Sequence, residues 1–139
     1  MSLKKAQDLF SERGVLQNAD FRCGNGLKVL KDKEADVIVI TGMGGQEIIS
    51  ILEDAKRQDV TFVLSPQSDI PDVRVWLIEN GYAILLDKTI ESAGKFYVLL
   101  KAQKGHTEYS PIEIKYGRDN ILDKSQDFVN WIDFELNRI

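Results

Sequence analysis

The sequence predicts an α/β protein with a doubly wound, mostly parallel sheet in which one strand is reversed. The run from Val37 to Ile40 is β-branched throughout and shows no polar alternation, which is typical of a parallel strand buried on both faces. Strand and helix patterns alternate along most of the chain. Two strand patterns then follow each other across a short connection at 91–95, which indicates an antiparallel hairpin.

The segment before the buried strand is predicted to be mostly helical and irregular. Apolar residues at three- and four-residue spacing predict a helix over 1–14 that ends at Gly14. A short strand is expected over 19–23. The Gly-Asn-Gly run at 24–26 predicts a turn, and 27–30 is expected to form a brief helical turn.

The later elements are predicted from the spacing of apolar residues. A spacing of about 3.6 residues indicates a helix, and alternation or a continuous apolar run indicates a strand. In chain order they are a helix over 46–57, a strand over 60–64, a helix over 72–80, two strands over 82–86 and 96–102, and a final helix over 119–139. Trp76 and Trp131 lie on predicted helices and are interpreted as packing residues.

Composition bounds the function. The 139 residues suffice for a single domain. The net charge of −4 provides no global basic field, so any nucleic-acid partner must be held by local patches. The single cysteine, Cys23, excludes an internal disulfide and makes a reducing cytoplasm the expected location. No apolar segment approaches the ~20 residues that a membrane crossing needs, so no membrane association is expected.

The most informative motif is the glycine-rich turn that follows the buried strand. Gly42, Gly44 and Gly45 allow a tight turn and a close approach of the backbone to a ligand. Ligands of open α/β sheets bind at the carboxyl ends of the strands, so a nucleotide-like ligand is expected near Thr41 to Gly45. The turn is not a dinucleotide fingerprint, because Glu47 stands where GxGxxG requires a glycine. A tight turn without a ligand is the alternative.

Two further loops carry polar groups. The amide of Asn25, between Gly24 and Gly26, suits the edge of an adenine, although a plain Asn-Gly turn is favoured locally. Gln67 and Ser68 follow the second buried strand at the same edge of the sheet, where ligand contact and a helix cap formed by Ser68 or its neighbour are equally expected. The sequence shows no Ser-His-Asp set, metal-ligand cluster or carboxylate pair, so hydrolysis and metal catalysis have little support.

Four segments together resemble one known family. They are RCGNGLKVL at Arg22 to Leu30, ADVIVITGMGG at Ala35 to Gly45, FVLSPQSDIPDVRVWLIENGY at Phe62 to Tyr82, and ESAGKFYVLLKA at Glu91 to Ala102. In this order they resemble the bacterial tRNA (adenine-N1)-methyltransferases, an S-adenosylmethionine-dependent family often called TrmK. The resemblance covers about residues 6–116. It implies a Rossmann-like class I methyltransferase sheet, S-adenosylmethionine as cofactor, tRNA as partner, and methyl transfer to N1 of an adenine.

The resemblance also implies site residues. In the family a Gly-Asp pair contacts the adenine of the cofactor, and Gly24-Asn25 stands there in this chain. The family's Q-P-N loop appears as Ser65-Pro66-Gln67. The expected cofactor-binding residues are Gly24, Asn25, Gly26, Thr41, Gly42 and Gly45, and the expected catalytic residues are Met43, Gly44, Gln67, Ser68 and Tyr97. No metal is implied.

One departure from the family concerns its N-terminal part. Family members carry a helical segment, a strand with the motif D-I-G-T-D-H, a helix and a second strand, none of which has a counterpart in this sequence. We therefore expect an N-terminally truncated, incomplete methyltransferase domain over 1–116 that lacks the first two strands, followed by a C-terminal helical segment over 117–139. Such a fragment is expected to be weakly active or inactive.

The expected loss of two strands leaves the strand at 37–41 with a bare edge. Each buried, unpaired backbone group there costs ~1–3 kcal/mol. We therefore expect the edge to be covered, either by residues 19–23 or by a second copy of the chain. Two other functions stay open: a non-catalytic module that binds RNA or protein, and a Rossmann-type oxidoreductase.

Overall fold

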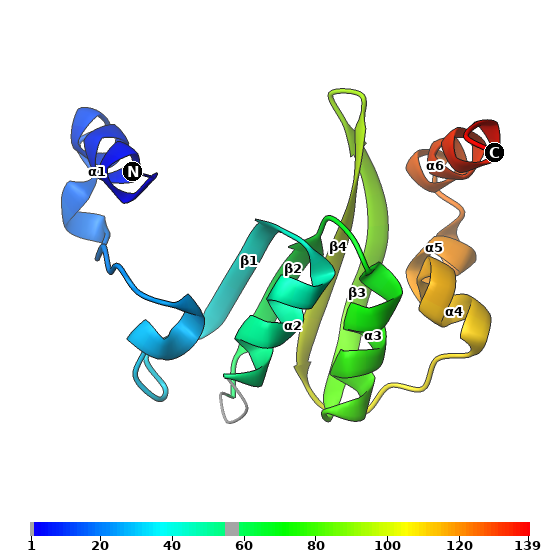
Figure 1. Ribbon diagram of the computed structural model, residues 1–139, viewed down its shortest axis with the longest axis horizontal. Coiled ribbons are helices and arrows are strands. Elements are labelled where there is room, and N and C mark those ends of the chain that lie inside the picture. The colour runs from blue at the N-terminus through cyan, green and yellow to red at the C-terminus, as the bar shows by residue number, and fades with distance from the viewer. Residues whose placement is uncertain (1, 55–58) are drawn as a thin grey trace.

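The computed structural model describes residues 2–54 and 59–139 and contains a four-stranded sheet in the order β1-β2-β4-β3 (Figure 1). The strands are β1 (Val37–Met43), β2 (Thr61–Pro66), β3 (Tyr82–Ser92) and β4 (Lys95–Lys104). β1 and β2 are parallel, while β4 runs antiparallel to both β2 and β3. The sheet confirms the α/β class and the single reversed strand.

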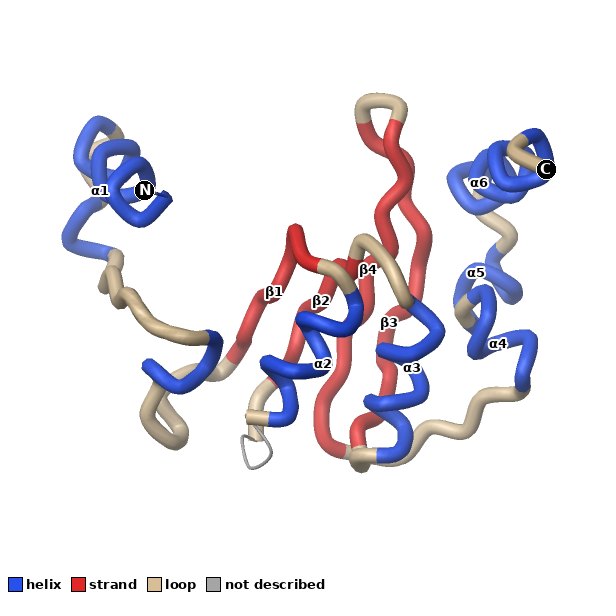
Figure 2. The backbone as a smooth tube through the Cα atoms, in the orientation of Figure 1, coloured by secondary structure: helices blue, strands red, loops and turns tan. Residues whose placement is uncertain are grey.

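Two helices cross over between the strands. They are α2 (Gly45–Glu53), which connects β1 to β2, and α3 (Ile70–Glu79), which connects β2 to β3. Both lie on the same face of the sheet (Figures 1 and 2). Right-handed crossovers that advance in one direction along a sheet place their helices on one face. The predicted doubly wound arrangement is therefore wrong for the described residues, since a second helical layer requires a crossover in the opposite direction from β1.

The hydrophobic core lies between this helical layer and the sheet. Alternate strand residues point toward the helices, which is why β1 and β2 bury every second side chain. The buried apolar residues are Ile38, Ile40, Ile48, Leu52, Val60, Phe62, Leu64, Val73, Leu77, Tyr82, Ile84, Leu100 and Ala102. The part of the predicted helix 46–57 that falls on 55–57 lies outside the described residues.

The hairpin of β3 and β4 is longer than predicted. Ala93 and Gly94, with φ of 50° and 76°, form its two-residue turn, and two left-handed residues match the twist of paired strands. β4 pairs with β2 only from Leu100 to Ala102, so the tip of the hairpin extends beyond the carboxyl end of β2 (Figure 1). The tip therefore overhangs the loop that follows β2.

The N-terminal segment forms α1 (Ser2–Glu12) and two short 3-10 turns, η1 (Leu16–Asn18) and η2 (Gly26–Val29). The predicted strand over 19–23 is wrong, because these residues pair with no strand. Local side-chain contacts, and not the hydrogen bonds of strand pairing, hold this segment. The ring of Phe21 packs edge-to-face on Phe10, with centroids 5.5 Å apart.

The outer edge of β1 pairs with no other strand among the described residues. Val37 and Val39 are 53% and 63% exposed on the face that carries no helix, so the prediction that this strand is buried on both faces is wrong for the described residues. The expectation that residues 19–23 cover this edge is wrong, since they lie apart from it as an irregular connection to α1 (Figure 2). Coverage by a second copy of the chain stays a prediction.

Three helices follow the sheet: α4 (Pro111–Tyr116), α5 (Arg118–Asp123) and α6 (Gln126–Asn137). α4 packs on α3, while α5 and α6 cover the opposite edge of the sheet, on β3. Side chains of α5 and α6 accept hydrogen bonds from the backbone N–H groups of alternate β3 residues. The pairs are Asp87 N to Asp119 Oδ2 at 2.8 Å, Thr89 N to Asn120 Oδ1 at 2.8 Å, and Glu91 N to Asp127 Oδ2 at 3.1 Å. This edge is thereby satisfied within the chain.

The single helix predicted over 119–139 is wrong, because α5 and α6 are separate. Lys124 ends α5 in the left-handed conformation, with φ of 48°. Ser125 then caps α6 by accepting a hydrogen bond from the N–H of Phe128 at 3.2 Å. The break lets α6 turn toward the tip of the hairpin (Figure 1). Among the described residues no helix combines the length and the apolar character that a membrane crossing requires.

Candidate functional site

The loops at the carboxyl ends of β1 and β2 are joined by two backbone hydrogen bonds. Gln67 N donates to Met43 O at 2.9 Å, and Gly45 N donates to Ser68 O at 3.0 Å. Gly45 is buried at this contact, where a Cβ would lie 2.4 Å from Ser68 O. The structure therefore brings together four of the predicted catalytic residues, Met43, Gly44, Gln67 and Ser68, at one edge of the sheet.

The three glycines of the turn serve different physical needs. Gly42 has φ of 76°, which an L side chain rarely adopts, and the space in front of its Cα is open. Gly45 is required by the close approach of the neighbouring loop instead. Gly44 lies next to the hydroxyl of Ser68, with 3.0 Å between the position of a Cβ and Oγ. Of these three glycines, Gly42 alone has open space at the position of a Cβ, and its role in ligand binding stays a prediction.

The prediction that a side chain of this loop caps the following helix is wrong. Asp69 occupies the N-cap position of α3, but its side chain accepts no capping hydrogen bond. Gln67 and Ser68 are exposed. Their polar groups are therefore available to a ligand at this edge of the sheet.

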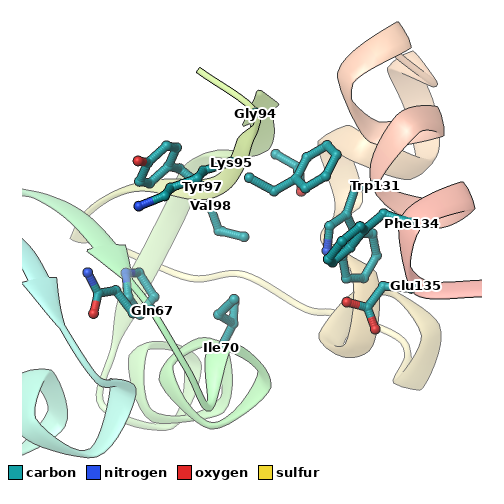
Figure 3. Close-up of a pocket in the computed structure, with 12 residues that line it drawn as sticks. Gln67, Ile70, Gly94, Lys95, Tyr97, Val98, Trp131, Phe134 and Glu135 are labelled. Carbon is teal, nitrogen blue, oxygen red and sulfur yellow. The ribbon is translucent and has the colours of Figure 1, made fainter. Parts of the chain in front are cut away.

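A pocket of about 520 Å³ opens beside this pair of loops (Figure 3). It lies between the loop after β2, the overhanging hairpin and α6. Its lining residues are Pro66, Gln67, Ile70, Thr89, Gly94, Lys95, Phe96, Tyr97, Val98, Trp131, Phe134 and Glu135. Of the predicted catalytic residues, Gln67 and Tyr97 line it, while Met43, Gly44 and Ser68 lie outside its lining.

Long-range hydrogen bonds fix the wall of the pocket that faces α6. Asn120 of α5 accepts from Thr89 N and donates to Thr89 Oγ1 at 3.0 Å and to Tyr116 O at 2.8 Å. Thr89 and Asn120 are both buried. Phe96 of the hairpin lies 5.5 Å from Phe134 of α6, measured between ring centroids. The same contacts that tie the C-terminal helices to β3 thus shape the pocket.

Sequence reasoning missed the α6 side of this pocket. The sequence predicts that Trp131 is a packing residue, and its ring does contact Tyr116 and Phe128. It also lines the pocket, together with Phe134 and Glu135. The spacing of these three residues along one helix face is the signal that the sequence carries, but it does not reveal which surface the helix faces.

The predicted cofactor residues do not all meet in one place. Gly26 lies against Ile51, because a Cβ on it would be 3.4 Å from that side chain. Ile51 and Gly45 are about 9 Å apart along the axis of α2, at the helical rise per residue. The turn at 24–26 and the turn at 41–45 therefore lie at opposite ends of α2. Cofactor binding by the former stays a prediction.

Arg22 anchors the irregular segment that precedes β1. Its guanidinium donates to Glu34 Oε2 at 2.8 Å, to Val29 O at 3.1 Å and to Asp20 Oδ2 at 3.0 Å. The hydrogen bond from Arg22, helped by the N–H of Lys31, lowers the pKa of Glu34 to about 2. The hydrogen bonds to the carboxylates of Glu34 and Asp20 raise the pKa of Arg22.

We expect this anchor to fail in acid. The pKa of Glu34 is lower in the folded chain than its ordinary 4.5, so its stabilising effect is complete above that pH and disappears as the pH falls toward about 2. The protection factors of the amides across residues 19–36, which are the intrinsic exchange rates at each pH divided by the observed rates, should therefore fall in this window. Glu34→Gln should show low protection factors that do not change over the same window. Titration of the Glu34 carboxyl at its ordinary pKa, followed by NMR, would contradict the expectation.

Comparison with known proteins identifies the family. Residues 1–100 match the methyltransferase domain family. The chain belongs to this family. The match favours a methyltransferase over the oxidoreductase alternative.

Named relatives and solved structures agree with this assignment. The tRNA (adenine(22)-N(1))-methyltransferase of Bacillus subtilis (strain 168) is 35% identical over 109 residues, which are 75% of this chain and 46% of that protein. A putative tRNA (m1A22) methyltransferase of Streptococcus pneumoniae superimposes with a TM-score of 0.89 at 28% identity, over 98% of this chain and 63% of that one. Its complex with S-adenosyl-L-methionine gives 0.88 at 28% identity, over 96% and 64%.

The resemblance to tRNA (adenine-N1)-methyltransferases that the motifs indicate is thereby confirmed. The methyltransferase domain spans about half the length of the curated Bacillus subtilis relative that it matches.

Proposed function

We propose that this methyltransferase domain serves S-adenosylmethionine-dependent methyl transfer to N1 of an adenine in tRNA. The observation that supports it is the pocket at the carboxyl ends of the strands: Gln67 lines this pocket, and its backbone N–H donates to Met43 O in the neighbouring glycine-rich turn. Relatives and structures that carry this activity in their names add support. We also propose that the methyltransferase domain ends at residue 116 and that a C-terminal helical segment follows over 117–139.

The residues of the glycine-rich turn fit one side of the cofactor. Thr41 and Gly42 are exposed at the carboxyl end of β1. The space in front of Gly42 is open, and a side chain at this position would fill part of it. Thr41 and Gly42 would hold the cofactor there through their backbone, whereas the N–H of Gly45 is already bonded to Ser68 O and positions the neighbouring loop. When bound, S-adenosylmethionine supplies a methyl group on an electrophilic sulfonium.

The chain's own residues are expected to position the base. N1 of adenine keeps its lone pair at neutral pH, so no general base is needed, and alignment of the reacting groups supplies ~7–11 kcal/mol in favourable cases. The amide of Gln67 matches the hydrogen-bonding edge of adenine. The ring of Tyr97, which lines the pocket from the hairpin, would provide a stacking surface (Figure 3). We expect weak activity from the chain alone, because the described residues supply one side of the cofactor site.

A methylation assay tests the proposal. The 139-residue chain, S-adenosylmethionine and transfer RNA are incubated, and N1-methyladenosine is measured by mass spectrometry of the digested RNA. Gln67→Ala should lower the rate by about 10- to 100-fold, since a good bidentate contact to a base contributes ~1–3 kcal/mol.

Gln126→Ala is the matched control. Its amide is exposed on α6 and bonds only Asn130, at 2.8 Å, among the described residues. The control should keep the rate of the unmodified chain. A chain that neither binds the cofactor in calorimetry nor methylates RNA contradicts the proposal, as does equal activity of Gln67→Ala and the unmodified chain.

A further inference from the structure

One face of α6 forms a wall of the pocket. Trp131, Phe134 and Glu135 stand at positions i, i+3 and i+4 and project into it, opposite Gln67 and Ile70 (Figure 3). A purely structural role would bury these rings. Phe134 is instead 48% exposed, although it contacts Phe96. The wall therefore presents aromatic surface to whatever enters the pocket.

The size and shape of the pocket suit a single flat ligand. Its volume of about 520 Å³ falls in the range of small-molecule sites. Aromatic rings come from both sides, Tyr97 and Phe96 from the hairpin and Trp131 and Phe134 from α6. All four nucleobases can stack on such rings, because each has a flat aromatic face. A base inside a duplex is enclosed by its neighbours and does not reach a pocket, so the fitting ligand is an unpaired base.

Polar groups on the rim select among bases. The carboxylate of Glu135 lines the pocket and accepts a hydrogen bond from Arg138 Nη1 at 2.9 Å, which leaves further lone pairs for a ligand. Carboxylates accept from the exocyclic amino groups of bases, and a glutamine amide such as that of Gln67 pairs with adenine. A purine with a carbonyl oxygen at position 6 would face the carboxylate with its own lone pairs. The rim thus favours adenine over hypoxanthine.

We propose that α6 is part of the substrate site: Trp131 and Phe134 stack on one unpaired adenine of an RNA, and Glu135 recognises its amino group. Lys95, at the tip of the hairpin, lies where it would meet the adjoining phosphate. The adenine as substrate rests on the proposed function, while the assignment of α6 to its recognition rests on the pocket.

Trp131 fluorescence tests this inference without cofactor or methyl transfer. Trp76→Phe leaves Trp131 as the one remaining tryptophan, since the chain contains two. The probes are an RNA hairpin with one unpaired adenosine in its stem, the same hairpin with inosine at that position, and a fully paired hairpin. The unpaired adenosine should quench Trp131 and bind at least tenfold more tightly than the paired hairpin.

Substitutions on α6 separate stacking from packing. Phe134→Leu should weaken binding of the unpaired adenosine by tenfold or more. Phe128→Leu is the matched control, because Phe128 stacks on Trp131 at 5.9 Å on the same helix and does not line the pocket. Glu135→Gln should keep the fold and reduce the preference for adenosine over inosine. Circular dichroism confirms that each variant is folded.

The inference is overturned if the adenosine and paired hairpins bind equally, if Phe128→Leu weakens binding as much as Phe134→Leu, or if Glu135→Gln leaves the adenosine preference unchanged. Its failure differs from that of the proposed function. Binding of the unpaired adenosine by a chain that never methylates RNA would refute the proposed function alone. Methylation that is equally fast in Phe134→Leu and the unmodified chain would refute this inference alone.

Discussion

Arg74→Met is expected to lower the free energy of unfolding by about 3–5 kcal/mol, because it leaves a charged partner buried and unpaired. Arg74 and Asp87 are 2% and 0% exposed. Their ion pair is bidentate, with Nε to Oδ2 and Nη2 to Oδ1 both at 2.8 Å. Methionine fills much of the volume of arginine and supplies no donor.

The pair also joins elements that are distant in sequence. Arg74 Nη1 donates to Ile114 O at 2.9 Å at the end of α4, and Tyr109 Oη donates to Asp87 Oδ2 at 2.9 Å. Burial, with the neighbouring Asp87 carboxylate adding to it, raises the pKa of Tyr109. Gly117 approaches so closely that a Cβ would lie 2.6 Å from Asp87 Oδ1. Loss of the guanidinium therefore loosens α3, β3 and the start of the C-terminal helices together.

Urea denaturation measures the effect. Lys88→Met is the control, because Lys88 pairs with Asp123 at 2.7 Å on the surface, and exposed pairs contribute about 0–1 kcal/mol. The double variant Arg74→Met, Asp87→Leu should recover much of the loss, since no charge is then left unpaired. If Arg74→Met lowers the free energy of unfolding by no more than Lys88→Met, the buried ion pair does not hold these elements together.

Gly45→Ala is expected to cost about 1–3 kcal/mol by overpacking and to reduce methyl transfer. The added Cβ would lie 2.4 Å from Ser68 O and 2.8 Å from Asp69 O. Both are backbone atoms, so the loop after β2 must move rather than a side chain. The movement breaks the hydrogen bond from Gly45 N to Ser68 O and displaces Gln67 from the pocket.

Denaturation and the methylation assay check this prediction side by side. Ser50→Ala places the same side chain at an exposed position of α2 and should change neither stability nor rate appreciably. Gly45→Ala with the stability of the unmodified chain would mean that the two loops are not held together as the structure shows.

Much of the sheet was predictable because its signals are local. The β-branched run at 37–40 is β1, and the apolar periodicity of 46–57 and 72–80 locates α2 and α3. The prediction that the Gly42–Gly45 turn and the Gln67 loop share one edge follows from parallel connectivity alone, and their backbone hydrogen bonds confirm it.

Other predictions failed where distant residues decide the structure. A strand over residues 19–23 would need a partner, and the described chain offers none beside them. The helical pattern over 119–139 conceals the break at Lys124 and Ser125, which is set by backbone conformation and a cap.

By itself the sequence determined the order of elements from β1 to β4, the reversed strand and the polar residues at the carboxyl edge of the sheet, because short windows carry the periodicity and turn chemistry that specify them. Only the tertiary structure decided that α6 closes a pocket over that edge. Asp119, Asn120 and Asp127 dock the C-terminal helices on β3 through hydrogen bonds that span about thirty residues of chain. Such contacts have no local pattern, since what specifies them is the satisfaction of buried backbone groups by side chains far away in the sequence.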